Sequence, residues 1–251
     1  MKAAIVVQVI GSDAGGKNYI DSFNSIFREN LQEYSNRNGY DLIVLEEPFT
    51  EDAGVGKKFF WQRLLIPDAF KEYDYVVSMD SDIYVNLDSP AIPFDEIPEG
   101  KIAAVNERKY FGNYEWRERI QAKYGWEKTG KDWYSLSGFD RDFNDHINGG
   151  LVIYQPKHHA KMFKDLYENN IGEFYKYHQD DQSIISIYGM DNDLIYWLDE
   201  RYNRIWSFWK EIMYPEFDSL PESHQQLYVR NFVSLNYFTH FTGRGQASLI
   251  K

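Results

Sequence analysis

Short apolar runs alternate with segments of helical periodicity along most of the chain, and this alternation constrains the fold more than any other feature. The apolar runs predict buried strands over 3–10, 40–47, 73–79, 101–106, 147–156 and 193–198. Between them, apolar residues recur every three or four positions, which predicts helices over about 19–38, 57–71, 156–166 and 179–189. Strands that alternate with helices are typical of an α/β domain with a mostly parallel sheet. We therefore expect a single α/β domain over 1–251.

The segment 106–146 interrupts this alternation. It is polar and unusually aromatic, with Tyr, Phe or Trp at 110, 111, 114, 116, 124, 126, 133 and 134. We expect it to form a helical insertion over one edge of the sheet. In such sheets ligands bind at the carboxyl ends of the strands, so that edge is where chemistry should be sought.

Composition excludes several classes of protein. The formal net charge of −12 and the pI of about 5.0 leave no broad basic face for nucleic acid, and they make an anionic membrane surface a poor partner. The chain has no cysteine, which excludes a disulfide framework, a thiolate nucleophile and a cysteine metal site. This composition fits a reducing compartment, and we expect the protein in the cytoplasm.

The N-terminal apolar run, 3–10, has two interpretations. It resembles the core of a signal peptide, but only Lys2 precedes it and no small-x-small cleavage site follows at Gly11-Ser12-Asp13. A buried first strand is therefore favoured. No apolar run approaches the roughly 18 residues of a membrane span, so no membrane-spanning segment is expected.

The stretch DYVVSMDSDIYVN (74–86) carries the strongest chemical signal, because a buried strand ends directly on Asp80 and Asp82. Residues two apart near a strand end can point the same way, and two neighbouring carboxylates repel each other unless a cation lies between them. Hard divalent cations prefer oxygen ligands, so the pair indicates a Mg²⁺ or Mn²⁺ site. The alternative is a solvated turn, since Asp-Ser-Asp is also typical of turns.

Further motifs follow in a fixed order. The stretch FWQRLLIPDAFKEYDYVVSMDSDIYV (60–85) places an arginine-bearing helix before the Asp-x-Asp strand. Later come INGGLVIYQP (147–156), DDQSIIS (180–186) with LDERYN (198–203), and THFTG (239–243). On these motifs the chain resembles the GT-A fold glycosyltransferases, most of all glycosyltransferase family 8 and its relatives. The resemblance covers most of the chain but not 106–146.

The resemblance implies a Rossmann-like nucleotide-binding sheet flanked by helices, with 106–146 as an acceptor-side insertion. It implies transfer of a sugar from a nucleotide-diphosphate sugar of the UDP type to a carbohydrate or glycoconjugate acceptor. The implied metal ligands are Asp80, Asp82 and His240, and one nitrogen ligand favours Mn²⁺ over Mg²⁺. A lone histidine after a strand can instead be a core residue that binds no metal.

The resemblance also implies which residues contact the substrates. The donor would be bound by Val9, Tyr19, Lys58, Arg63, Asp80, Ser81, Asn148, Gly149, Gly243 and Arg244. The family has a Lys-Pro-Trp soon after the histidine, whereas this chain has Arg244-Gly245-Gln246, so Arg244 takes the place of the lysine. The aromatic residues of the insertion are candidates for the acceptor site, with Trp133 foremost.

Asp181 and Gln182 are the implied residues of the reaction centre. Asp181 would act as the base that deprotonates the acceptor hydroxyl, or Gln182 would lie beneath the oxocarbenium-like carbon in an enzyme that retains configuration. The stereochemical outcome stays open. In the alternative interpretation both residues only begin a helix, where acidic and polar side chains are favoured.

Two other functions compete with a glycosyltransferase. A phosphohydrolase of the HAD type also uses an apolar strand followed by Asp-x-Asp, but it needs a later strand that ends in another acidic pair. The stretch before Asp180-Asp181 is YKYH, which is no such strand. A carbohydrate-binding module with a divalent metal is the non-enzymatic alternative, and hydrolysis of a nucleotide sugar would exclude it.

Overall fold

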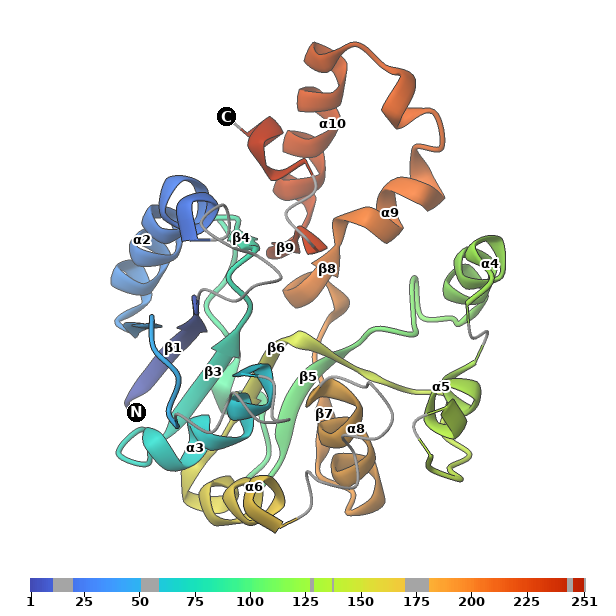
Figure 1. Cartoon of the computed structure of the whole chain (residues 1–251). Coiled ribbons are helices and arrows are strands. Elements are labelled where there is room, and N and C mark those ends of the chain that lie inside the picture. The colour runs from blue at the N-terminus through green and yellow to red at the C-terminus, as the bar shows by residue number, and fades with distance from the viewer. Residues whose placement is uncertain are drawn as a thin grey trace.

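The computed structural model of the chain describes residues 1–10, 20–50, 59–126, 129–136, 138–169, 181–242 and 246–250. Within them a six-stranded sheet has the order β2-β1-β3-β6-β5-β7 (Figure 1). The strands are β1 (Ala3–Gln8), β2 (Asp41–Leu45), β3 (Tyr75–Met79), β5 (Ile102–Asn106), β6 (Ile147–Tyr154) and β7 (Ile195–Trp197). Each of them falls within an apolar run of the sequence, so the six predicted strands are confirmed.

The direction of β6 determines what meets at the edge of the sheet. Three pairings, β1–β2, β1–β3 and β5–β7, are parallel, whereas β6 runs antiparallel to both β3 and β5. The carboxyl ends of the other strands therefore share one edge with the amino end of β6. As a result Asn148 and Gly149 lie next to Asp80, whose backbone N–H donates to the carbonyl of Gly150 at 2.8 Å.

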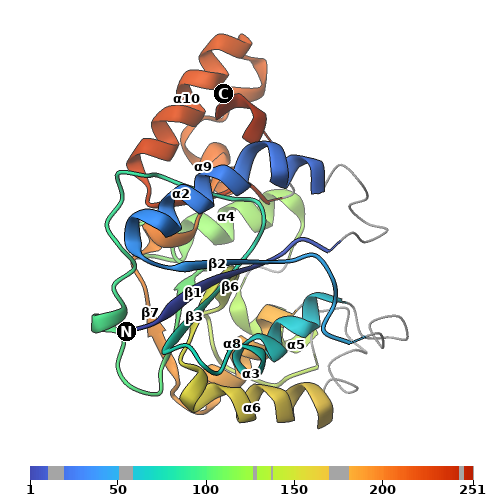
Figure 2. The same ribbon diagram turned by 90° about the vertical axis from the view of Figure 1, so that its left-hand side faces the viewer.

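Helices cover both faces of the sheet (Figure 2). On one face, Phe23, Phe27 and Leu31 pack against apolar side chains of β1, β3 and β6. On the other face, residues of α6 and α8 pack against β5 and β6. The helices of these two layers are the π-helical turn Phe23–Phe27, α2 (Arg28–Asn38), α3 (Ile66–Ala69), α6 (Pro156–Asn169) and α8 (Asp181–Asp191).

One predicted helix ends as expected, and another forms differently from the α-helix that was expected. The first ends where predicted, at Gly39, whose φ of 69° suits glycine and closes the last turn. The helix expected over 57–71 is instead a 3-10 helix over Phe59–Leu65 followed by the single turn of α3. Pro67 explains the difference, because its missing N–H is tolerated only in a first helical turn.

A second, three-stranded sheet was not predicted. It has the order β4-β9-β8 and comprises β4 (Ile83–Val85), β9 (Phe238–His240) and β8 (Arg204–Ile205). β9 lies between the other two, antiparallel to β4 and parallel to β8. This small sheet joins the chain just after Asp82 to the chain that ends in His240.

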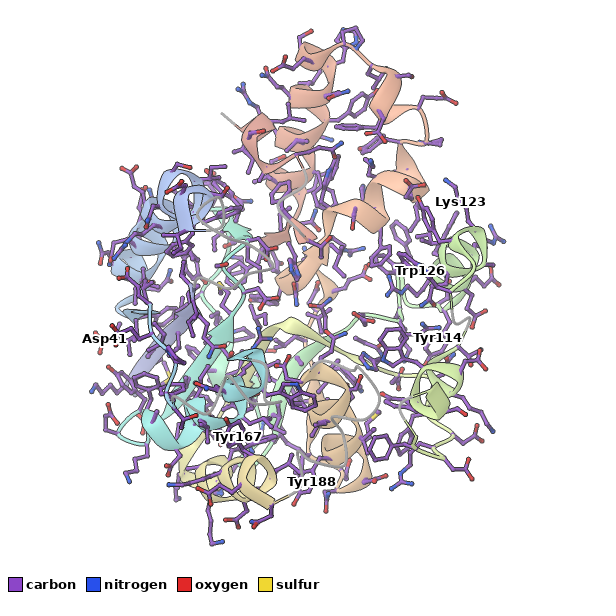
Figure 3. All side chains as sticks on the ribbon, in the orientation of Figure 1. Asp41, Tyr114, Lys123, Trp126, Tyr167 and Tyr188 are labelled. Atoms are coloured by element: carbon purple, nitrogen blue, oxygen red, sulfur yellow. The ribbon has the colours of Figure 1, made fainter. Side chains whose placement is uncertain are left out.

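The segment 106–146 forms two helices, α4 (Glu115–Tyr124) and α5 (Gly130–Leu136), at the side of the sheet away from β2, as the positions of Tyr114 and Trp126 relative to Asp41 show (Figure 3). α4 packs against α9 (Trp206–Met213), where the Arg117 guanidinium lies 3.7 Å from the centre of the Phe208 ring. The helical content expected for this segment is therefore present.

The C-terminal part projects beyond the sheet as α9 and α10 (Glu222–Leu235) (Figure 1). Trp206 of α9 packs its buried ring against Phe217 and Phe232, so it is a core residue. Short 3-10 helices occupy Phe94–Glu96, Glu200–Asn203, Phe217–Ser219 and Ala247–Ile250. No helix in the described ranges is both long and apolar enough to cross a membrane.

Candidate active site

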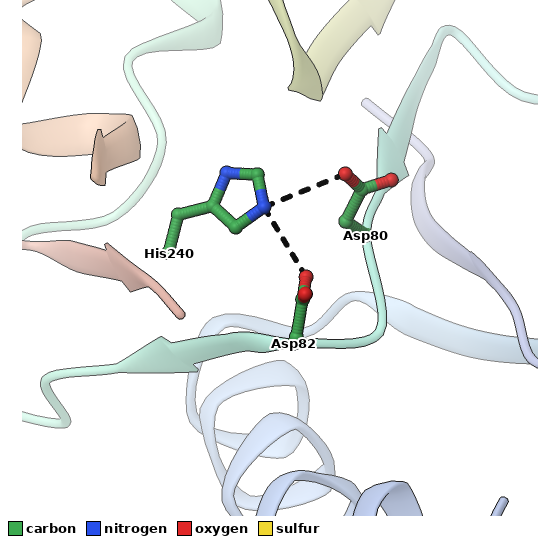
Figure 4. Close-up of side chains that lie close together, drawn as sticks. All are labelled: Asp80, Asp82 and His240. Atoms are coloured by element: carbon green, nitrogen blue, oxygen red, sulfur yellow. Dashed lines mark ion pairs between the residues drawn. The ribbon is translucent and has the colours of Figure 1, made fainter. Parts of the chain in front are cut away.

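Two carboxylates and one imidazole meet at the edge of the main sheet (Figure 4). Asp80 follows β3, Asp82 precedes β4, and His240 ends β9. Because Ile83 pairs with His240 in the small sheet, the histidine is held beside Asp82. His240 Nε2 lies 3.2 Å from Asp82 Oδ1 and 3.6 Å from Asp80 Oδ2. One ligand atom from each residue lies within 4.8 Å of the others, so the three residues come together as predicted.

The two carboxylates of this group raise the proton affinity of the histidine. Asp82 and His240 are buried, with exposed fractions of 6% and 5%. Burial lowers the pKa of His240, but the carboxylates of Asp82 and Asp80 outweigh it and the net effect is a raised pKa. The imidazole therefore tends to carry a proton between the two carboxylates, where a divalent cation would replace that positive charge. The donor set of two carboxylates and an imidazole fits such an ion.

Asn203 fixes the orientation of the imidazole. The side-chain oxygen of Asn203 lies 3.1 Å from His240 Nδ1, and an amide oxygen only accepts hydrogen bonds. Nδ1 therefore carries the hydrogen, which leaves Nε2 to face the carboxylates. Asn203 in turn donates to Asn148 Oδ1 at 2.6 Å. Sequence reasoning missed this role of Asn203, although the residue ends the LDERYN motif.

Two glycines of β6 leave room for the site. A Cβ atom at Gly150 would lie 2.5 Å from Cε1 and Nδ1 of His240, so a side chain there would displace the imidazole. At Gly149 a Cβ atom would lie 3.0 Å from Gln182 Cβ and 3.1 Å from Arg63 Nη1. The packing around His240, Arg63 and Gln182 thus favours glycine at both positions. Gly150 was not among the predicted site residues.

Arg63 connects the metal-binding candidates to the start of α8. Its buried guanidinium contacts a carboxylate oxygen of Asp80 and the carbonyl of Gly149, and its Nε lies 3.2 Å from Asp181 Oδ2. From the sequence, Arg63 is expected to bind the sugar donor. In the structure its guanidinium instead contacts groups of the chain itself. In this structure its charge is used to hold Asp80 and Asp181 in one site.

Asp181 and Gln182 face this site from the first turn of α8. Asp181 is 4% exposed, and burial raises its pKa to about 6, with Arg63 opposing the shift and Asp80 adding to it. Gln182 Oε1 accepts the backbone N–H of Gly149 at 3.0 Å. Both residues begin a helix, as the plainer interpretation holds, and both also lie against the residues that surround His240 and Arg63.

The architecture of the chain matches solved structures, although no protein-family model and no curated protein matches its sequence. One match is a glycosyltransferase involved in the glycosylation of the major capsid of PBCV-1, at 17% identity and a TM-score of 0.55, covering 98% of this chain and 96% of that one. Another is the galactosyltransferase LgtC in complex with donor and acceptor sugar analogs, at 14% identity and a TM-score of 0.57, covering 95% and 86%. The chain has the GT-A fold.

A third match is the bifunctional glycosyltransferase WbbM, at 14% identity and a TM-score of 0.55. The match covers 96% of this chain and 45% of that one. These likenesses span almost the whole chain. They confirm the predicted GT-A fold, including the mostly parallel sheet flanked by helices.

Three of the remaining predicted residues can be placed relative to the site. Ser81 is buried between the two aspartates, and Val9 follows β1 with its side chain in the core. Trp133 is half-buried, and its indole N–H donates to Ser183 Oγ at 3.0 Å, so it joins α5 to α8 beside Gln182. Four predicted residues lie outside the described residues, namely Tyr19, Lys58, Gly243 and Arg244.

A buried polar network, also missed by sequence reasoning, supports the site from the insertion. Asn148 Nδ2 donates to Glu107 Oε2 at 3.3 Å, and Glu107 Oε1 lies 3.3 Å from Arg117 Nη2 and 3.6 Å from His146 Nδ1. The order in sequence gives no sign of these contacts, because they join the start of β6 to α4. They show that α4 of the insertion supports Asn148 through Glu107.

Proposed function

We propose that the protein is a metal-dependent glycosyltransferase that moves a sugar from a UDP-linked sugar to a carbohydrate acceptor. The observation that carries the proposal is the grouping of Asp80, Asp82 and His240 at the ligand-binding edge of a GT-A sheet. The fold alone is compatible with other activities, since a fold can host several functions. The two carboxylates and the imidazole would hold a divalent cation, and such an ion would offset the negative charge of a nucleotide-diphosphate donor.

Asp80, Asp82 and His240 would hold the cation, which we take to be Mn²⁺ because of the nitrogen ligand, with Mg²⁺ as the alternative. When bound, such an ion neutralises the negative charge that develops on a leaving diphosphate. A bound cation is especially important in this protein, because a chain of net charge −12 repels a polyanionic donor. Further positive charge is assigned to Lys58 and Arg244.

The chain's own residues bind and orient the reactants. We assign the donor sugar to the start of β6, where Asn148 and Gly149 lie, and the nucleotide to Val9, Tyr19, Ser81 and Gly243. Asp181 would accept the proton of the acceptor hydroxyl, since a pKa of about 6 leaves it ionised near neutral pH yet close enough in basicity for proton transfer. In an enzyme that retains configuration, Gln182 takes the place beneath the reacting carbon instead.

Trp133 has two roles in this proposal, and the sequence implied only one of them, contact with the acceptor. Its indole nitrogen holds Ser183, the residue after Gln182, so it would order the start of α8 as well as border the acceptor. Replacing it should then disturb the reaction centre together with acceptor binding.

A screen of nucleotide sugars tests the proposed function. We expect Mn²⁺-dependent hydrolysis of at least one UDP-sugar, lost in EDTA and in Asp82→Asn, with Asp88→Asn as the matched control at an exposed aspartate three residues beyond β4. Hydrolysis unaffected by EDTA or by Asp82→Asn would refute the metal site. Sugar binding without any turnover would favour the carbohydrate-binding module.

Release of phosphate from simple phosphate esters would favour the phosphohydrolase. Among the described residues, the group that could hold a metal around Asp80 and Asp82 is completed by His240 from β9, which favours the glycosyltransferase over that alternative.

A further inference from the structure

A pocket of about 410 Å³ opens at the carboxyl ends of β5 and β7. Its walls come from the segment after β5 and from the chain between β7 and β8, and they include Asn106, Lys109, Trp197, Asp199, Arg201 and Arg204. Arg204 pairs across the small sheet with Thr239, the residue before His240. The pocket thus lies one strand away from the metal-binding candidates, and its volume falls within the roughly 300–1,000 Å³ of small-molecule sites.

The cations of this pocket are already neutralised by the chain. Arg201 Nη2 lies 2.8 Å from Asp199 Oδ2, and Lys109 Nζ lies 3.2 Å from Asp145 Oδ1. Arg204 contacts the Glu200 carboxylate. A phosphate or carboxylate ligand would have to break one of these pairs. A neutral ligand with many hydroxyl groups can instead donate to the carboxylates and accept from the cations while each pair stays intact.

The walls are also preformed. The guanidinium of Arg204 stacks 4.8 Å from the centre of the Trp209 ring, and that of Arg201 lies 4.2 Å from the centre of the Tyr237 ring. Groups that are held in place before binding lose little conformational freedom when a ligand arrives. Trp197 adds an indole, which pairs an apolar face with a polar edge, as a sugar ring does.

We propose that this pocket binds a neutral sugar unit of the acceptor glycan. The proposal rests on the proposed glycosyltransferase function and specifies its acceptor: an uncharged carbohydrate, held one strand away from His240 by Arg201, Asp199 and Trp197. The acceptor would then approach the reaction centre from the β5–β7 side, whereas Val9 and Ser81, which we assign to the nucleotide, follow β1 and β3.

Binding of simple sugars tests the pocket without nucleotide, metal or turnover. Saturation-transfer NMR with the methyl glycosides of glucose, galactose and mannose should show at least one that binds. Arg201→Ala, which removes one exposed ion pair, should weaken that binding at least tenfold. The matched control is Arg141→Ala, because Arg141 forms a 2.8 Å pair with Asp191 at similar exposure but far from the pocket residues in sequence and outside its lining.

Several results would overturn the proposal: none of the three glycosides binds, Arg201→Ala binds as well as the wild type, or Arg141→Ala weakens binding equally. Tighter binding of methyl glucuronoside than of the neutral sugars would overturn its charge assignment. A melt of each variant verifies folding, and Lys109→Ala gives a second variant of the same wall if Arg201→Ala is unfolded. Failure of the wild type to hydrolyse any UDP-sugar counts against the proposed function separately, since the sugar-binding measurement does not depend on it.

Discussion

His240 Nδ1 lies 3.1 Å from the side-chain oxygen of Asn203, and this contact turns the other ring nitrogen toward Asp82 at 3.2 Å. Because the amide oxygen can only accept, it selects the tautomer with hydrogen on Nδ1. A histidine that binds a metal through Nε2 needs that tautomer. The arrangement explains why a buried asparagine, which binds no ion itself, belongs to the site.

The first prediction follows from this contact. Asn203→Ala should weaken Mn²⁺ binding in the presence of UDP by about 10–100-fold, the usual effect of losing a partner of a metal-bound histidine. Titration calorimetry measures the affinity. Asn236→Ala is the control, since Asn236 is equally buried and donates at 2.7 Å to the carbonyl of Phe232, away from the site. Equal affinities in both variants would show that Asn203 only supports the fold.

Gly150 gives a steric prediction. A methyl group there would lie 2.5 Å from two atoms of the His240 ring, so Gly150→Ala should displace the imidazole and abolish tight Mn²⁺ binding. Gly189→Ala is the control, because its Cβ would clash at 2.8 Å with Ile195 in the core and should lower stability without changing metal affinity. Calorimetric titration and thermal melts of the two variants should therefore give opposite patterns. Unchanged Mn²⁺ affinity in Gly150→Ala would refute the role of the glycine.

The sequence predicts the six strands of the main sheet because buried strands are continuous apolar runs, as in β3 and β6. It does not predict β4, β8 and β9, which have only two or three residues each and exist through pairing with one another. The same reason explains the missed residues. Asn203 and Gly150 act through contacts with His240, and such contacts follow from the fold and not from a local pattern.

Arg63 is a residue that the sequence singled out but whose contacts it did not predict. Its motif predicts a position just before the Asp-x-Asp strand, and the structure puts its guanidinium against Asp80. Its partners depend on the three-dimensional arrangement, in which Asp181 arrives from a distant helix. The position of Arg63 near Asp80 was therefore predictable, whereas its other partners were not.

A third prediction concerns pH and the metal. The net raised pKa of His240 means that the metal-free protein gains stability from the protonated imidazole below about pH 6.5, and loses it as pH rises through the raised pKa. Mn²⁺ binding requires the neutral ring, so its affinity should fall as pH drops below that pKa. Stabilisation by Mn²⁺, measured as the difference between melts with the ion and with EDTA, should therefore increase with pH. In His240→Asn this dependence should be absent, and a persistent rise would assign it to another group.

The last prediction concerns Asp181. Burial raises the pKa of its carboxyl to about 6, so the fold favours the neutral form, and at neutral pH the ionised group costs stability on the order of 1–3 kcal/mol. Asp181→Asn, a neutral isostere, should therefore melt at a higher temperature at pH 7.5 while losing sugar transfer. Such a gain of stability with loss of activity is expected where a destabilising group is kept for function.

Asp145→Asn is the contrasting control. Asp145 is half-buried, which raises its pKa, but hydrogen bonds from Tyr114 and Asn106 and the nearby Lys109 lower it overall, so the ionised form stabilises the fold. The control should lower the melting temperature at the same pH. The wild-type transfer rate should also rise with pH through about 6, and the rise should be absent from any residual activity of Asp181→Asn. A destabilised Asp181→Asn that still transfers sugar would assign Asp181 to the first turn of α8 alone, as an acidic residue that favours a helix start.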